Sequence, residues 1–277
     1  MKIKEIKISI DIFSLINYWI KLRKRKIRTV NGHKFNLKPD KPDKRDIKYK
    51  TLRIISLPES TELKNIKRFD LRYDQETLGS CTANAFLHAY LFILTVTGKA
   101  VVSLSRIFQY GNTRDPRFSN DDSGGSIRNA FKAANKYGIC LEELWPYIVS
   151  KFNIMPPPKC FEDALNHQSI RYEKITMAVK QSIMEALFYS NPVVCGIPVY
   201  ESFESDEVAR TGIVPMPNKC KEQLLGYHAI CMLDYDKDGV WCLNSWGKYW
   251  GKGGTFHLPW DFVLKYASDI WVLYSVE

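Results

Sequence analysis

The chain has 277 residues, of which 45% are hydrophobic, 13% aromatic and 25% charged. This composition is typical of a globular protein and excludes a disordered one, and the length allows a large core without disulfide or metal support. The seven cysteines form no C-x-x-C pair, and no Cys/His cluster has zinc-ligand spacing. We therefore expect neither a structural metal nor a cofactor.

Positive charge is concentrated at the start of the chain. Residues 1–50 hold 16 Lys/Arg and 5 Asp/Glu, and because the whole chain carries +10, residues 51–277 sum to about −1. An enzyme that acts on nucleic acid would carry a basic surface on its folded body. We therefore expect no nucleic-acid partner.

The first apolar stretch, residues 8–20, follows three lysines and superficially resembles a signal peptide. Asp11 and Asn17 interrupt it, and a run of Lys and Arg follows it without a small-residue cleavage site. The pattern disfavours a cleaved secretory signal, and its length excludes a membrane-spanning helix. An intracellular protein, or one packaged in a particle, is favoured over classical secretion.

Three interpretations remain open for residues 1–56. Residues 33–50 are rich in Lys, Asp and Pro, and residues 38–43 predict an extended, solvated linker. The whole segment is then a removable pro-segment lying on the body, a flexible tail, or a basic amphipathic anchor that contacts a membrane surface through residues 1–28. We expect the folded body to occupy residues 57–277.

The first strong element of the body is an apolar helix that runs from Ser80 to Leu94. Ser80 is a favourable N-cap and Gly98 a natural stop, which puts Cys81 in the first turn. Amides at a helix N-terminus stabilise a thiolate, so this position predicts a lowered pKa and a nucleophilic cysteine. The alternative is a buried cysteine that acts only as a small hydrophobe.

The C-terminal half supplies partners for a nucleophile. An apolar run that begins at His228 is followed by a turn at Asp238-Gly239 and a second apolar run that ends at Asn244. Two such runs predict a β-hairpin, which brings His228 and Asn244 close together. A cysteine on a helix N-terminus, a histidine on a strand and an asparagine that orients the histidine make a complete catalytic set.

Other histidines and a possible calcium loop are weaker candidates. His88 lies two helical turns from Cys81, and His257 lacks an evident orienting residue. Residues 234–239 begin like an EF-hand loop, but Ser245 stands where a bidentate Glu is required. We expect a surface turn there and no metal site.

The chain resembles the papain-like cysteine peptidases, which include the cathepsins. Ordered motifs that carry the resemblance are Gln75-Glu76-Thr77-Leu78-Gly79-Ser80-Cys81, Asp122-Ser123-Gly124-Gly125, Lys136-Tyr137-Gly138-Ile139, Trp145-Pro146-Tyr147, His228-Ala229 and Asn244-Ser245-Trp246-Gly247-Lys248-Tyr249-Trp250-Gly251. The resemblance implies an α+β fold with two lobes. A helical lobe with the nucleophile helix would face a β-barrel-like lobe, with the active-site cleft between them.

The resemblance also implies a role for each matched residue. Cys81 would be the nucleophile, His228 the base and acid, and Asn244 the residue that orients His228. The implied substrate-side residues are Gln75 as oxyanion donor, Gly124 and Gly125 as backbone partners of an extended peptide, Trp246 as cover of the His228–Asn244 bond, Tyr227 as a bulky neighbour of His228, and Asp269 as an acidic determinant in the pocket for the substrate's second residue.

Some positions depart from the secreted members of the family. Leu78 and Thr82 replace a disulfide cysteine and a tryptophan beside the nucleophile, and the wording is closer to a branch found in bacteria and large DNA viruses. We expect a monomeric cysteine endopeptidase that cleaves protein or peptide substrates through a Cys81 thiolate and His228 imidazolium pair and an acyl-enzyme intermediate. We also expect it to be made as a zymogen and to be inhibited by its own N-terminal segment. An acyl transferase or amidase with the same triad, or a silent peptide-binding scaffold, remains an alternative.

Overall fold

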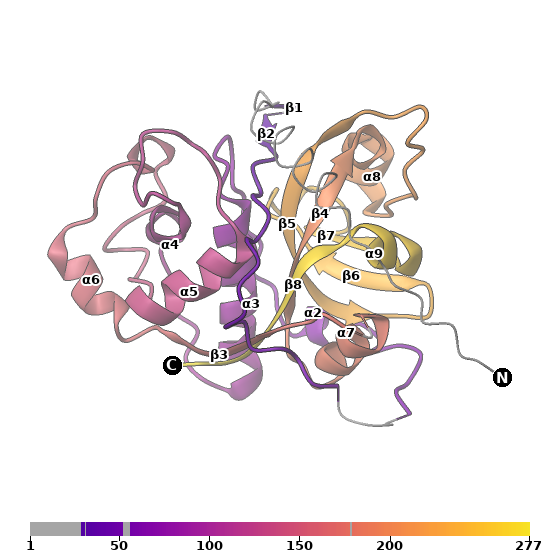
Figure 1. Cartoon of the computed structure of the whole chain (residues 1–277), viewed down its shortest axis with the longest axis horizontal. Coiled ribbons are helices and arrows are strands. Elements are labelled where there is room, and N and C mark those ends of the chain that lie inside the picture. The colour runs from indigo at the N-terminus through magenta and orange to yellow at the C-terminus, as the bar shows by residue number, and fades with distance from the viewer. Residues whose placement is uncertain (1–28, 31, 52–55, 178) are drawn as a thin grey trace, which may run out of the picture.

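Two lobes meet along one central helix in the computed structural model, which describes residues 29–30, 32–51, 56–177 and 179–277 (Figure 1). The helical segments are α2 (Lys64–Lys67), α3 (Cys81–Thr97), α4 (Arg106–Thr113), α5 (Ile127–Tyr137), η1 (Val149–Lys151), α6 (Pro158–Ala164), α7 (Val179–Phe188), η2 (Glu201–Glu204), α8 (Asp206–Thr211) and α9 (Trp260–Tyr266). The strands are β1 (Thr29–Val30), β2 (His33–Lys34), β3 (Ser169–Lys174), β4 (Val193–Tyr200), β5 (Leu224–Tyr235), β6 (Gly239–Leu243), β7 (Thr255–Pro259) and β8 (Ser268–Val276). Helices α3 to α6 lie in one lobe and the large sheet with α7, α8 and α9 in the other, which confirms the predicted two-lobed α+β fold.

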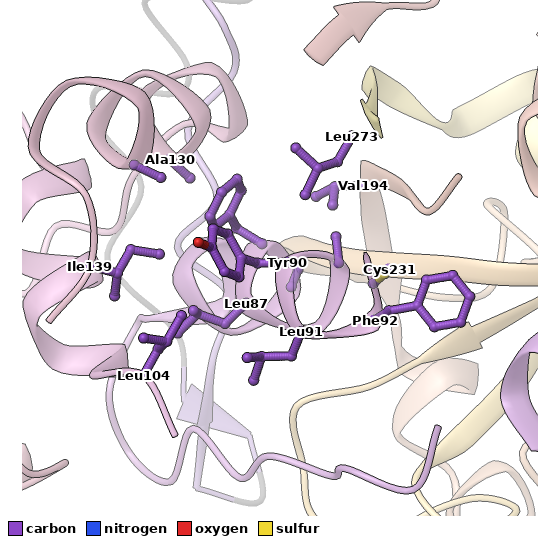
Figure 2. Packing of buried hydrophobic residues seen from close by; sticks show 14 of the residues in the cluster. Leu87, Tyr90, Leu91, Phe92, Leu104, Ala130, Ile139, Val194, Cys231 and Leu273 are labelled. Carbon is purple, nitrogen blue, oxygen red and sulfur yellow. The ribbon is translucent and has the colours of Figure 1, made fainter. Parts of the chain in front are cut away.

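Helix α3 forms the buried centre of the molecule. It begins at Cys81 and ends at Thr97, and the next residue, Gly98, caps it with a φ of +71°, the left-handed conformation that glycine adopts at little cost. Figure 2 shows its side chains, among them Leu87, Tyr90, Leu91 and Phe92, packed among Ala130 of α5, Val194 of β4, Cys231 of β5 and Leu273 of β8. Full burial of each large apolar side chain contributes about 1.5–3 kcal/mol, so the helix holds its first residue in a fixed position.

The large sheet has the strand order β3-β8-β4-β5-β6-β7, with every neighbouring pair antiparallel. Strand β5 is buried on both faces and alternates accordingly. Ala229, Cys231 and Leu233 join the core around α3, whereas Ile230 and Met232 join the core on the opposite face, which includes residues of α7 and α9. This alternation fixes the register of the strand that carries His228.

The predicted hairpin is present, but its turn lies one residue earlier than expected. The N–H of Asp236 donates to the carbonyl of Gly239 (2.9 Å), which makes Lys237 and Asp238 the two-residue turn. The Asp236 carboxylate accepts hydrogen bonds from the N–H groups of Asp238 and Gly239, both at 2.9 Å. This side-chain turn selects the register, and Asp238-Gly239 does not.

Residues 33–51, which we call the crossing segment, run between the two lobes (Figure 1). The N–H of Lys38 donates to the carbonyl of Gly125 in the helical lobe (2.9 Å), and the N–H of Leu37 donates to that of Tyr227 in the sheet lobe (3.1 Å). The predicted solvated linker is wrong at Asp40, whose side chain is completely buried. The crossing segment is thus part of the packed structure.

Among the described residues, no helix combines the length and hydropathy that a membrane crossing requires. The membrane-surface anchor predicted for residues 1–28 lies outside the described residues.

Candidate active site

Cys81 is the first residue of α3, and its side chain is completely buried. Burial raises the pKa of the thiol to about 11, although a hydrogen bond from the backbone N–H of Ala229 acts in the opposite direction. The lowered pKa predicted from the helix N-terminus is wrong for this arrangement, because desolvation of the thiolate outweighs its favourable partners. The contact with Ala229 nevertheless places the sulfur beside the strand that carries His228.

His228 lies in β5, and Asn244 directly follows β6. The Nε2 atom of His228 lies 2.8 Å from the Oδ1 atom of Asn244, which also accepts the N–H of Ser245 at 2.8 Å. With Oδ1 as acceptor, Nε2 carries the proton, and buried Nδ1 has no hydrogen-bond partner among the described residues. Burial lowers the pKa of His228 to about 4, and nearby His33 acts in the same direction. The imidazole and the Cys81 thiol are therefore both neutral in this arrangement.

Aromatic rings surround the imidazole. The ring of Trp246 lies 5.1 Å from that of His228 between centroids, and Trp250 packs perpendicular to Trp246 at 4.8 Å. His33 of the crossing segment stacks on the Trp246 ring at 4.1 Å, with 4° between the planes. Trp246 thus lies where the resemblance implies a cover for the His228–Asn244 hydrogen bond.

Gln75 is completely buried and held by its Oε1 atom. The Ser245 hydroxyl donates to Oε1 at 2.6 Å, so the segment that carries Asn244 also fixes the amide of Gln75. The opposite end of the amide, Nε2, donates to the carbonyl of Leu78 (3.0 Å) and to that of Lys34 (3.4 Å). A carbonyl oxygen of the crossing segment therefore lies at the donor that the resemblance assigns to the oxyanion.

The predicted backbone partners of a substrate contact the crossing segment. Gly124 has a φ of +68°, and a Cβ atom added there would lie 1.8 Å from the carbonyl oxygen of Asn36. The carbonyls of Gly125 and Tyr227 accept the N–H groups of Lys38 and Leu37, as described above. An extended chain thus lies against these three residues, although this chain is part of the protein itself.

Asp269 lies at the start of β8, and its carboxylate pairs with residues of the crossing segment and of β3. Its carboxylate accepts the backbone N–H of Asp40 (2.8 Å) and the Lys174 ammonium (3.0 Å). Burial and the Asp40 charge raise the pKa of Asp269. Leu37 packs against Gly196, where an added Cβ atom would lie 2.5 Å from the Cδ2 atom of Leu37 and 3.0 Å from the hydroxyl of Ser268, the residue before Asp269. The contribution of Asp269 to substrate choice stays a prediction.

The rival groups have other partners. His88 is buried on α3, its Nε2 accepts the N–H of Tyr73 (3.3 Å), and burial lowers its pKa to about 3. His257 pairs with Asp236 at 3.1 Å and lies in the edge strand β7, which β6 separates from the strand that carries His228. Among the described residues, no group of three or more His, Cys, Asp or Glu side chains is arranged to hold a metal ion.

Comparison with known proteins assigns the chain to a family. Residues 57–262 match the family model described as papain family cysteine protease. The chain belongs to the papain family. It is 38% identical over 265 residues to an uncharacterized peptidase C1-like protein of Acanthamoeba polyphaga mimivirus, a match that covers 85% of each chain. The predicted resemblance is confirmed, and cysteine proteases of this family act on protein or peptide substrates.

Solved structures of the papain family share the fold. Xylellain, a cysteine protease from Xylella fastidiosa, matches with a TM-score of 0.80 and 30% identity, over 88% of this chain and 96% of that chain. Digestive procathepsin L 3 of Tenebrio molitor matches with a TM-score of 0.63 and 16% identity, over 83% and 75% of the two chains. The viral and bacterial relatives agree with the branch that the sequence wording indicated.

Sequence reasoning missed three residues of the site. Ser245 holds Gln75, and its place inside the Asn-Ser-Trp-Gly motif was an available signal. The Tyr147 hydroxyl lies 2.8 Å from the Ser80 hydroxyl and donates to the carbonyl of Gln75 (2.8 Å), which links the start of α3 to Gln75. His33 on Trp246 had no signal in the sequence, because no motif includes it.

Proposed function

We propose that this papain-family protein is a cysteine endopeptidase with Cys81 as nucleophile, His228 as base and acid, and Asn244 as the residue that orients the imidazole. The Cys81 sulfur bonds to a peptide carbonyl carbon while its proton passes to Nδ1 of His228. The imidazolium returns this proton to the departing amine, and water then cleaves the thioester and releases the acid. The partnerless Nδ1 atom and the Asn244 bond on Nε2 support this assignment.

The oxyanion of the tetrahedral intermediate would form at Gln75. Its Nε2 and the backbone N–H of Cys81 would donate to the oxygen as that atom becomes negative. The Lys34 carbonyl at 3.4 Å from Nε2 supports this role, since it already occupies the place of an acceptor. Ser245 keeps the amide in the correct orientation by donating to its other end.

We infer further that residues 1–56 are a pro-segment, that residues 57–277 are the peptidase domain, and that the crossing segment blocks the site. Phe35 and Leu37 are each 7% exposed, and Asn36 is 9% exposed. Cys81 and His228 are both 0% exposed, and the Phe35 ring meets the His228 ring edge-on, with 6.3 Å between their centroids. A peptide cannot reach the sulfur while residues 33–38 hold this position.

Ion pairs fix the crossing segment on both lobes. Asp40 accepts the N–H of Arg128 (2.9 Å), the indole N–H of Trp271 (2.8 Å) and the Lys174 ammonium (3.1 Å). The Arg128 side chain also forms an ion pair with Asp46. Since the Asp40 side chain is completely buried, removal of its carboxylate would leave the Arg128 N–H and the Trp271 indole N–H without their acceptor, at a cost of about 1–3 kcal/mol for each donor, whereas Lys174 would keep its ion pair with Asp269.

The complete burial of Cys81 and His228 beneath residues 33–38 is the observation that carries the zymogen proposal. Intact mass against time, in a thiol reductant at mildly acidic pH, tests it with the wild type beside Cys81→Ala. We expect the wild type to lose a basic N-terminal piece and the variant to remain whole. A full-length wild type that cleaves peptides rapidly would refute the blocking role.

The same samples separate the alternative reactions. Peptide products formed in the presence of added amine reveal water or the amine as the acceptor of the acyl group. A product that carries the amine in place of a free acid identifies an acyl transferase. If an unblocked chain modifies no peptide, while iodoacetamide alkylates Cys81 in a parallel sample and so shows that the thiol is accessible, the protein is a silent scaffold.

A further inference from the structure

Asp122 presents a carboxylate beside the catalytic residues. Both of its oxygens lie near the N–H of Gly79 (3.1 and 3.0 Å), and the Tyr110 hydroxyl donates to its Oδ1 atom at 2.5 Å. Gly79 precedes the nucleophile by two residues, and the negative charge of Asp122 is one of the influences on the pKa of Cys81. Both donors belong to the body of the protein, so they hold the carboxylate in place whether or not the crossing segment is present.

A lysine of the crossing segment fills the remaining acceptor position. The ammonium of Lys34 lies 2.7 Å from Oδ2 of Asp122, whose side chain is only 11% exposed. The carbonyl of the same lysine accepts the Nε2 hydrogen bond of Gln75. One residue thus places its carbonyl oxygen at the oxyanion donor and its side-chain cation on Asp122.

The two faces of the segment have different surroundings. Asn36, two residues after Lys34, donates from its side chain to the carbonyl of Asp122 (2.8 Å). Phe35 instead contacts the rings of His228 and Trp246 in the sheet lobe. Alternation along an extended chain therefore directs Lys34 and Asn36 toward the helical lobe, where Asp122 is the carboxylate that they meet.

Among the described residues, Lys34 is the ion-pair partner of Asp122. Another cation of the helical lobe, Arg114, lies over the Tyr110 ring at 4.8 Å and donates to the carbonyls of Ser119, Asp121 and Phe152. Loss of the crossing segment would therefore leave the largely desolvated Asp122 carboxylate without its cation. Because Lys34 bonds Gln75 through its carbonyl and Asp122 through its ammonium, the two residues are one lysine side chain apart.

We propose that Asp122 makes this peptidase select Lys or Arg as the residue whose carbonyl is attacked. The inference rests on the proposed peptidase function and adds a substrate class to it. In the blocked protein Lys34 occupies this position, and in a substrate a basic side chain takes its place. The selectivity depends on a charge-assisted hydrogen bond in a partly buried site, where such bonds are stronger than at the surface.

Competition between two peptides that differ only in Lys and Met at the attacked residue tests the proposal. The ratio of their kcat/KM values is independent of how much full-length protein has opened, so the protein needs no truncation. We expect the wild type to favour the Lys peptide about ten- to hundredfold, and Asp122→Asn to lower this ratio at least tenfold. Asp121→Asn is the matched control, because it removes the same charge one residue away, and it should change the ratio less than twofold.

A second measurement does not depend on turnover. Iodoacetamide alkylation of Cys81 reports how often the segment leaves the site, and Lys34→Met should accelerate it in the wild type but not in Asp122→Asn. Equal cleavage of both peptides would overturn the selectivity and leave the peptidase function standing. If neither peptide is cleaved, although iodoacetamide alkylates Cys81 in a separate sample, the peptidase function is refuted instead. If Lys34→Met then accelerates alkylation equally in the wild type and in Asp122→Asn, the cation site at Asp122 is overturned as well.

Discussion

Leu37 offers a quantitative test of the blocked state. Its side chain is 7% exposed and packs against Gly196 of β4, which pairs with Ser268 of β8. Leu37→Ala removes buried carbon atoms and leaves a void, which costs about 2–3 kcal/mol where neighbours relax only partly. The lost contacts exist only while the crossing segment is docked. The ratio of blocked to open protein should therefore fall by about 30- to 150-fold.

The rate of Cys81 alkylation by iodoacetamide measures this ratio, because the reagent reaches the sulfur only in the open state. A Cys220→Ser background removes the one exposed thiol, and the other six cysteines are buried. Ile47→Ala is the matched control, since Ile47 lies in the same segment but is 63% exposed. We expect it to leave the alkylation rate nearly unchanged.

Equal alkylation rates for Leu37→Ala and the wild type would refute the reasoning, provided that circular dichroism shows both proteins folded. Such a result would mean that Cys81 becomes accessible by a motion that does not involve the crossing segment. A rise of similar size in Ile47→Ala would equally refute it, because exposed contacts would then matter as much as buried ones.

Three further predictions follow from the same site. Gly124→Ala should accelerate Cys81 alkylation, because the added Cβ atom would lie 1.8 Å from the carbonyl oxygen of Asn36. Gly253→Ala is the control and should not change the rate, since Gly253 has a similar φ of +65° but, apart from its chain neighbours, no atom of the described residues within 4 Å of the added Cβ. Equal alkylation rates in the two variants would contradict the predicted clash. Gln75→Ala should lower kcat of the open enzyme about 10²- to 10³-fold with little change in KM, and steady-state kinetics that show a change in KM alone would exclude an oxyanion role. Burial lowers the pKa values of His88 and His228 to about 3 and about 4, so below pH ~6.5 the unfolded chain binds protons that the native protein excludes. The free energy of unfolding should therefore fall as the pH decreases from about 6.5 toward 4, by up to about 2.7 kcal/mol per pH unit for the two histidines together. Urea unfolding of Cys81→Ala at pH 7 and pH 5 measures this fall, and equal free energies at the two pH values would contradict the prediction.

Local patterns and ordered motifs were sufficient to predict the lobes, helix α3 and the positions of Cys81, His228 and Asn244. Helical and strand periodicity are local properties, and the motifs record residues that must meet in space. The position of the hairpin turn was harder to predict, because two turns are compatible with the sequence. One has Asp238-Gly239 at its centre, and the other is closed by hydrogen bonds to the Asp236 side chain; residue propensities alone do not decide between them.

Docking of the crossing segment could not be predicted from its own residues. The Lys, Asp and Pro residues around Asp40 predict a solvated segment. The partners that bury Asp40, however, come from α5, β3 and β8, more than 80 residues away in the chain. The lowered pKa expected for Cys81 was wrong for the same reason, since the helix terminus is local whereas its cover is not.

Strand β5 links the position of His228 to the docking of the crossing segment. Tyr227, whose carbonyl accepts the N–H of Leu37, immediately precedes His228. Whichever folding event brings His228 to Cys81 also delivers the acceptor on which the crossing segment docks. During synthesis, residues 33–51 leave the ribosome long before this strand and are already tethered nearby at high effective concentration. If residues 1–56 are the proposed pro-segment, the step that brings His228 to Cys81 would therefore also complete the surface on which the crossing segment docks.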